Sequence, residues 1–174
     1  MRTCHETPAR PISVMTESAE AVAAALSSRR SVTIEITNLS GNYCLINPKV
    51  YLEKGSIPVP PQPTVRPLKT EKRHDFIETV AIMFSVPYDG NMYKNWFALG
   101  IYPKGTECNE ALYKKMYYDK EPQGFVRMEA VGSGITFEGS YLDVKTTMSP
   151  LGRAIMKVEI WDKLFSAPGQ QQKY

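Results

Sequence analysis

Short segments in which apolar and polar residues alternate recur along most of this chain, and this pattern constrains the fold most. In SVTIEITN, residues 31–38, Val32, Ile34 and Ile36 fall on one face, which is typical of a half-buried strand. Many short strands and only two helical segments predict a mainly β protein, a β-sandwich with a helix against each sheet. A second strand is expected over 43–55, with a break near Pro48. A proline-rich connector follows, and the next strand is expected to end at Val86. The remaining strands are expected over 96–102, 125–128, 135–137, 141–146 and 154–161.

Two segments have the spacing of helices. The first covers residues 16–28, with Thr16 as its cap and a weakly amphipathic face that is mostly alanine. The second lies within TECNEALYKKMYYDK, residues 106–120, with Thr106 as the expected cap and a core stripe of Cys108, Leu112 and Met116. This stripe already supplies a core face, so some of the remaining aromatic residues of the helix must point outward: Tyr113, Tyr117 and Tyr118.

One domain is expected over residues 16–164, with a disordered tail over 1–15 and a loose tail over 165–174. The formal net charge of +3 is too small to indicate a nucleic-acid partner. No apolar run approaches the ~20 residues of a membrane-spanning helix, and the first residues lack the apolar stretch of a secretory signal peptide. We see no phosphate loop, nucleophile elbow or metal-ligand spacing, so neither an enzyme nor a cofactor is predicted.

The segment FSVPYDGNMYKNWFALGIY, residues 84–102, crowds aromatic residues around a turn at Asp89-Gly90. Tyr88, Tyr93 and Trp96 stand where water normally reaches a hairpin. Outward tyrosine rings suit a membrane interface or a ligand cage, because their faces attract a quaternary ammonium and their hydroxyls bond a phosphate. Phosphocholine carries both groups. Tyrosine faces also stack on sugars, so a lectin-like carbohydrate-binding module without pore formation stays open as the alternative.

The motif FSVPYDGNMYKNWF, followed by ALYKKMYY on the second helix, closely resembles the actinoporins, the sea-anemone pore-forming cytolysins, and still more their vertebrate actinoporin-like relatives. The resemblance covers residue 17 to about residue 164 and implies the same β-sandwich flanked by two helices. It also implies binding of phosphocholine headgroups, a preference for sphingomyelin, and cation-conducting pores formed by insertion of the N-terminal helix. The headgroup site that it implies consists of Ser85, Pro87, Tyr93, Tyr113, Tyr117, Tyr118 and Lys54.

Further roles and departures follow from the same resemblance. Trp96 matches an aromatic residue at the membrane interface, whereas Met92 replaces a tryptophan of the toxins and Lys54 a serine. The segment before Met83 is shorter than in the toxins, so one strand and its hairpin are expected to be shortened or lost, and EPQGF replaces an Arg-Gly-Asp sequence after the second helix. In the N-terminal helix, the residues expected to take part in a pore are Glu17, Glu20, Val22 and Leu26.

The partners implied are membrane lipid headgroups and further copies of the chain on the membrane. The resemblance implies a secreted monomer that acts on a target cell membrane. Three cysteines with no disulfide pattern, Cys4, Cys44 and Cys108, fit the cytoplasmic alternative instead. Asn38-Leu39-Ser40 is an N-glycosylation sequon that we do not expect to be used, because Asn38 ends a strand.

Overall fold

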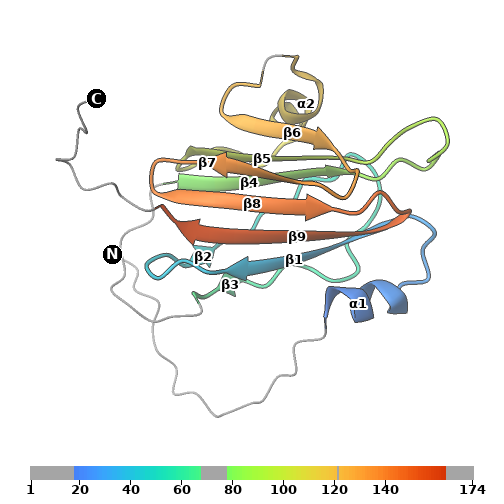
Figure 1. Ribbon diagram of the computed structural model, residues 1–174, viewed down its shortest axis with the longest axis horizontal. Coiled ribbons are helices and arrows are strands. Elements are labelled where there is room, and N and C mark those ends of the chain that lie inside the picture. The colour runs from blue at the N-terminus through green and yellow to red at the C-terminus, as the bar shows by residue number, and fades with distance from the viewer. Residues whose placement is uncertain (1–17, 68–77, 121, 164–174) are drawn as a thin grey trace, which may run out of the picture.

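A computed structural model of the protein describes residues 18–67, 78–120 and 122–163. The prediction of a β-sandwich flanked by two helices is confirmed (Figure 1). In chain order, the elements are α1 (Ala19–Ala25), β1 (Ser31–Asn38), β2 (Leu45–Ile46), β3 (Thr64–Val65), β4 (Glu78–Ser85), β5 (Trp96–Pro103), α2 (Glu110–Tyr118), β6 (Phe125–Glu129), β7 (Gly134–Glu138), β8 (Leu142–Met148) and β9 (Arg153–Asp162).

The strands form two main sheets and one short ladder. The first sheet has the order β1-β9-β8-β7, the second has the order β4-β5-β6, and β2 pairs only with β3. β1 and β9 run parallel, from Ser31 opposite Arg153 to Asn38 opposite Ile160, whereas all other pairs are antiparallel. The first long strand is therefore held in the sheet by the last one, so β1 can pair only once β9 is in place.

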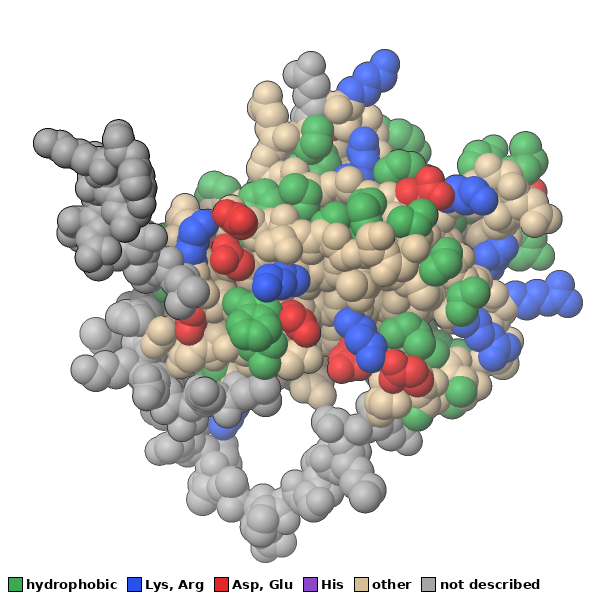
Figure 2. All heavy atoms as spheres, viewed as in Figure 1, with side chains coloured by type: hydrophobic (Ala, Val, Ile, Leu, Met, Phe, Trp, Pro, Cys, Tyr) green, Lys and Arg blue, Asp and Glu red, His purple; other side chains and the backbone are tan. Residues whose placement is uncertain are grey.

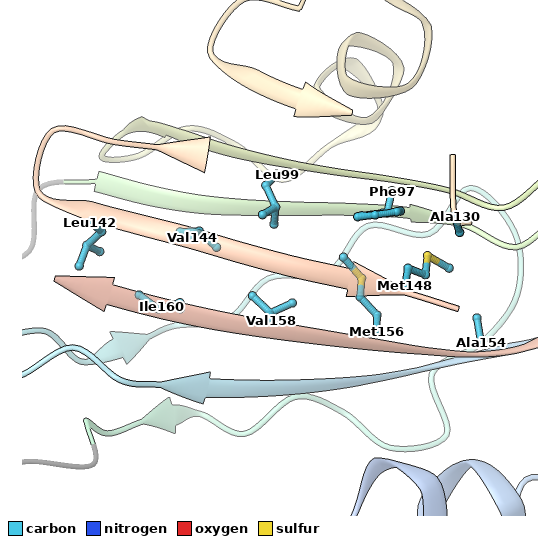
Figure 3. Packing of buried hydrophobic residues seen from close by; sticks show 10 residues of the cluster. All are labelled: Phe97, Leu99, Ala130, Leu142, Val144, Met148, Ala154, Met156, Val158 and Ile160. Atoms are coloured by element: carbon cyan, nitrogen blue, oxygen red, sulfur yellow. The ribbon is translucent and has the colours of Figure 1, made fainter. Parts of the chain in front are cut away.

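The main core lies between the two sheets and is shown in Figure 3. Side chains alternate along a strand, so Phe97 and Leu99 of β5 face this core while Ala98 and Tyr102 face α2. β5 is covered on both faces, which explains its run of buried residues. The members of the main core are Phe97, Leu99, Ala130, Leu142, Val144, Met148, Ala154, Met156, Val158 and Ile160.

The helices cover opposite faces of the sandwich, as predicted (Figure 1). α2 packs on the outer face of the β4-β5-β6 sheet through Met116, which is 2% exposed. α1 packs on β1 and β9 through Ala19 and Ala23, the two buried members of its alanine face. Its cap is Ser18, whose Oγ accepts a hydrogen bond from the Ala21 amide at 3.2 Å.

Two helix boundaries differ from the prediction. α1 has seven residues rather than the thirteen of 16–28, because the backbone is already extended at Leu26 (ψ 129°). α2 begins after Asn109, whose side chain accepts from the Leu112 amide at 3.1 Å. The predicted cap, Thr106, instead donates to the carbonyl of Pro103 at 2.8 Å in the turn after β5.

The strand predicted over 43–55 is also wrong, since only Leu45–Ile46 is paired. Asn47 has a positive φ of 55°, and Pro48 after it has no amide hydrogen to donate, so the ladder stops there. The tails over 1–15 and 165–174 and the segment 68–77 lie outside the described residues.

β1 ends in a buried polar network that contains the glycosylation sequon. Asn38 and Ser40 are 2% and 1% exposed. The Asn38 Nδ2 donates to the Tyr43 carbonyl at 2.7 Å, and the Ser40 hydroxyl donates to the Asn38 Oδ1 at 2.6 Å. In the folded protein the Asn38 amide is therefore already used to fix the turn after β1.

Candidate functional site

Four tyrosines on and beside α2 contact one another through their rings, and we call them the tyrosine array. Tyr113 and Tyr117 are stacked, with ring centroids 5.7 Å apart and planes 19° apart. Tyr118 meets Tyr117 edge-on at 4.7 Å, and Tyr51 lies 6.1 Å from Tyr113 at an interplanar angle of 44°. Tyr118 is 60% exposed and the other three are half-buried, so the array presents ring surface to solvent.

The helix spacing creates this array. Tyr113 and Tyr117 are one turn apart and lie on one side of α2, while Met116 faces the sheet. Cys108, the third member of the predicted core stripe, is not in the core. It precedes the helix, is exposed, and its Sγ donates to the Lys49 carbonyl at 3.6 Å. The segment that follows Lys49 is thereby held beside α2, and it supplies Tyr51.

The surroundings of Tyr113 and Tyr51 raise the pKa of these two phenols. Burial first, and then the negative charge of Glu53, raise the pKa of Tyr113 to about 12. Partial burial, followed by Glu110 and Glu53, also raises the pKa of Tyr51. Glu110 itself is paired with Lys114 at 2.6 Å. Neutral rings beside a carboxylate favour a cation as the ligand.

Ser85 and Trp96 lie side by side at the end of the β4-β5-β6 sheet. They are paired across β4 and β5. Ala81 and Met83 pack with Met116 of α2, so the alternation of β4 places Ser85 on the same face of the sheet as α2. Both residues are half-buried. This predicted pair therefore lies on the face that carries the tyrosine array.

Arg127 of β6 joins Trp96 to the end of α2. Its guanidinium carbon lies 5.8 Å from the centroid of the Trp96 ring. The same guanidinium donates to three carbonyls at the C-terminal end of the helix, those of Met116 (3.1 Å), Tyr117 and Asp119 (2.9 Å). These carbonyls have no partner within the helix, so Arg127 fixes the part of α2 that carries Tyr117 and Tyr118.

The β4–β5 loop, residues 86–95, carries a second group of exposed apolar side chains. Asp89 shapes its turn, because its Oδ1 accepts from the amides of Asn91 (3.0 Å) and Met92 (3.2 Å). Tyr88, Met92 and Tyr93 are 85%, 72% and 58% exposed. The loop projects at the right of Figure 1, where Figure 2 shows hydrophobic and basic side chains gathered at the edge of the molecule.

A cleft of about 390 Å³ lies at the base of this loop, lined among others by Arg30, Tyr93, Lys94 and Glu129. The Arg30 Nε donates to the Tyr88 carbonyl at 3.1 Å, which ties the loop to the segment before β1. Among the described residues, Tyr93 makes no ring contact with the tyrosine array. The predicted headgroup residues therefore fall into two groups, one at α2 and one in the loop.

Three other predicted residues have less defined surroundings. Pro87 is half-buried at the start of the loop. Lys54 is exposed, and it forms no ion pair with the described residues. Met92 is at the tip of the turn, open to solvent.

The residues predicted for a pore helix lie on or next to α1. Glu20 is exposed and its Oε1 lies 2.8 Å from the Nζ of Lys157, whose hydrogen bond lowers the pKa of Glu20. Val22 and Leu26 are half-buried, and Leu26 is the cap after the last helical residue. Glu17 lies outside the described residues. Neither helix in the described parts of the chain is long and apolar enough to cross a bilayer.

Three residues of the site were missed from the sequence: Tyr51, Glu53 and Arg127. Each acts through a contact with a distant segment of the chain. Tyr51 and Glu53 stand in the segment wrongly predicted as a strand, and Arg127 was counted only as a residue of an alternating strand. The role of Arg127 at the end of α2 depends on β6 being the neighbour of β5 in the sheet, and this strand order cannot be read from a local sequence pattern.

The β-sandwich flanked by two helices, with the tyrosines of α2 brought together, agrees with the resemblance to the actinoporins seen in the sequence. The profile of the sea anemone cytotoxic protein family matches residues 72–162, more than half of the chain, and the chain belongs to this family. It is 29% identical over 86 residues to DELTA-actitoxin-Afr1c of Actinia fragacea and 31% identical over 84 residues to DELTA-stichotoxin-Hcr4a of Radianthus crispa. Each match covers 47% of this chain and 44% of the relative.

A third relative is cytolysin tenebrosin-B of Actinia tenebrosa, 27% identical over 86 residues, which are 47% of this chain and 36% of that protein. The matched region therefore spans less than half the length of these curated relatives. They are named as toxins and a cytolysin, so the comparisons do not favour the carbohydrate-binding alternative.

Proposed function

We propose that this protein binds lipid surfaces that display phosphocholine headgroups, with sphingomyelin preferred. The observation that carries this proposal is the tyrosine array, which presents ring surface on the same face of the β4-β5-β6 sheet as the Ser85–Trp96 pair. Each ring face that meets the choline ammonium contributes about 0.5–2 kcal/mol. The Ser85 hydroxyl and the Lys54 ammonium are the groups proposed to hold the phosphate.

The β4–β5 loop is proposed to contact the membrane interface next to the headgroup. Tyr88 and Tyr93 are amphipathic rings that suit the headgroup region, and Met92 is the apolar tip between them. Lys94, which is exposed in the same loop, adds a positive charge. Arg30 bonds the loop backbone, so that docking of the loop is transmitted to the segment between α1 and β1.

Membrane binding is proposed to precede insertion of the N-terminal segment and assembly of several copies into a cation-conducting pore. In this proposal Glu17 and Glu20 line the conducting path, while Val22 and Leu26 face lipid. The protein is proposed to be secreted and to act on a target cell membrane, and the names of its relatives, an actitoxin and a cytolysin, support this proposal.

The test is cosedimentation with vesicles of sphingomyelin and phosphatidylcholine, with soluble phosphocholine as competitor. Tyr118→Ala, which removes a 60% exposed ring, should weaken binding roughly two- to thirtyfold, the worth of one cation–π contact. Trp161→Ala on β9 is the matched control, because that ring is also exposed but lies in the other sheet. Binding that resists both the competitor and Tyr118→Ala would refute the proposal.

A further inference from the structure

β4 is an outer strand of the β4-β5-β6 sheet, and the edge that it turns away from β5 is open. In the described parts of the chain β4 pairs only with β5. None of the backbone hydrogen bonds that join other described segments involves β4. Alternate residues of an antiparallel strand direct their N–H and C=O groups to opposite edges, so about half of the backbone groups of β4 point away from β5. This edge can accept one more strand.

β4 lacks the residues that protect the other outer strands of the two main sheets. β1 carries Glu35, and β7 carries Glu138. β6 carries Arg127 and Glu129. In β4 the only charged residue is the first, Glu78, and the rest of the strand contains no charge, proline or glycine. Charges, proline and bulges on an edge strand prevent pairing between molecules, so the composition of β4 favours such pairing.

We propose that β4 pairs antiparallel with β4 of a second copy of this chain and joins the two three-stranded sheets into one continuous sheet. Such a contact has two-fold symmetry, so the edge must be complementary to itself. A pairing centred on Ile82 places Thr79 opposite Ser85 of the second copy. Ala81 then lies opposite Met83 of the second copy, and both belong to the face that α2 covers. No like charges meet along the contact, and each face of the sheet continues into the same face of the other copy.

The joined sheet has room for both copies of α2. Within one copy α2 contacts β4, β5 and β6, so it lies over the middle strand, β5. In the dimer each β5 is three strand spacings from the β5 of the other copy, about 14 Å, whereas packed helices need only about 8–10 Å. The two-fold axis is perpendicular to the sheet, and the twist is roughly 20–25° per strand, so both tyrosine arrays stay on one side of the dimer.

This inference goes beyond the proposed function, because the pairing of β4 forms in solution and needs no lipid. A two-fold contact closes with two copies, whereas a ring of several copies needs a head-to-tail contact. The β4 dimer is therefore a different assembly from the proposed pore. Its two tyrosine arrays would meet one membrane together.

The experiment is sedimentation equilibrium of the full chain over about a hundredfold range of concentration, because dimer formation follows mass action. The native chain should form a dimer. Thr79→Lys should weaken the dimer roughly tenfold or more, because each copy then brings an unpaired ammonium group into the contact. Thr136→Lys is the matched control, since it makes the same substitution on β7, an outer strand of the other sheet, and it should leave the dimer unchanged.

Hydrogen exchange of the native chain tests the same contact without a substitution. Amides of β4 that exchange fast in the dilute monomer should become protected as the dimer forms, and those of β7 should not. A chain that stays monomeric would overturn the inference. So would β4 amides that are all protected in the monomer, or a dimer that both lysine variants weaken equally. Loss of vesicle binding with an intact dimer would instead refute only the proposed headgroup function.

Discussion

Arg127→Ala should loosen the C-terminal end of α2 and, with it, the tyrosine array. Arg127 lies on β6, donates to three carbonyls of the helix end, and covers Trp96. Alanine leaves these carbonyls without a donor and removes the charge that complements the negative end of the helix dipole. We therefore expect a loss of stability together with a loss of order at Tyr117 and Tyr118.

The size of the stability loss depends on how deeply each hydrogen bond of Arg127 is buried. The carbonyls of Met116 and Tyr117 are part-buried and share one nitrogen of Arg127, so we count them as one charged hydrogen bond of about 1.5–3 kcal/mol. The bond to Asp119 is exposed, and water replaces it with little loss, ~0.5 kcal/mol. The expected decrease in the free energy of unfolding is therefore about 2–3.5 kcal/mol.

Urea unfolding followed by fluorescence measures this decrease, and the ring resonances of the array report its local order. Arg127→Lys should fall between the native chain and Arg127→Ala, because an ammonium keeps the charge but not the planar fork that reaches several carbonyls. Binding to sphingomyelin vesicles should weaken in the same order. An unfolding free energy within 0.5 kcal/mol of the native value, or an array that stays ordered in Arg127→Ala, would refute this reasoning.

Three further predictions concern other parts of the molecule. The pKa of Tyr113 rises from 10.0 to about 12 on folding, so the neutral phenol contributes its full stabilisation of the folded state below pH 10 and loses it as the pH passes through 12. The unfolding free energy of Tyr113→Phe should therefore decline less steeply than that of the native chain between pH 10 and pH 12. Asn38→Ala should cost about 1–3 kcal/mol in urea unfolding, because it removes one donor from the part-buried Tyr43 carbonyl and the acceptor of the buried Ser40 hydroxyl. Mass spectrometry of secreted protein should find Asn38 unglycosylated. Dye release from sphingomyelin vesicles should be much lower than for an anemone toxin at equal amounts of bound protein. The reason is that α1 spans only seven residues, whereas a helix that crosses ~30 Å of hydrocarbon needs about 20. Toxin-like release would show that residues before Ser18 extend the inserted helix.

The fold was largely predictable because its strands carry the period-two pattern and its turns carry glycine. Val32, Ile34 and Ile36 do pack against the core, and β4 to β9 lie within one or two residues of their predicted ends. The errors lie where backbone chemistry competes with the pattern. Asn47 with Pro48 ends β2 early, and Asn109 is a better cap than Thr106 because it directly precedes the helix.

The candidate site was predictable only in part, because half of it depends on contacts between distant segments. The α2 tyrosines share a helix, so their spacing brings them together whatever the rest of the chain does. Tyr51 and Glu53 reach that helix only through the path of an irregular segment, which no local pattern encodes. Arg127 reaches it only because β6 is the neighbour of β5.

The two helices are held to the sandwich with unequal strength, and this difference suits their proposed roles. α1 fully buries only the methyl groups of Ala19 and Ala23, at ~0.8 kcal/mol for each such group; Val22 is half-buried, and the ion pair to Lys157 is exposed. α2 buries Met116, a side chain worth about 1.5–3 kcal/mol when fully buried, and Arg127 binds its last carbonyls. Detaching α1 therefore costs less free energy than disturbing the tyrosine array. An N-terminal helix that leaves the sheet would break its contacts with β1 and β9 while the tyrosine array on α2 stays assembled.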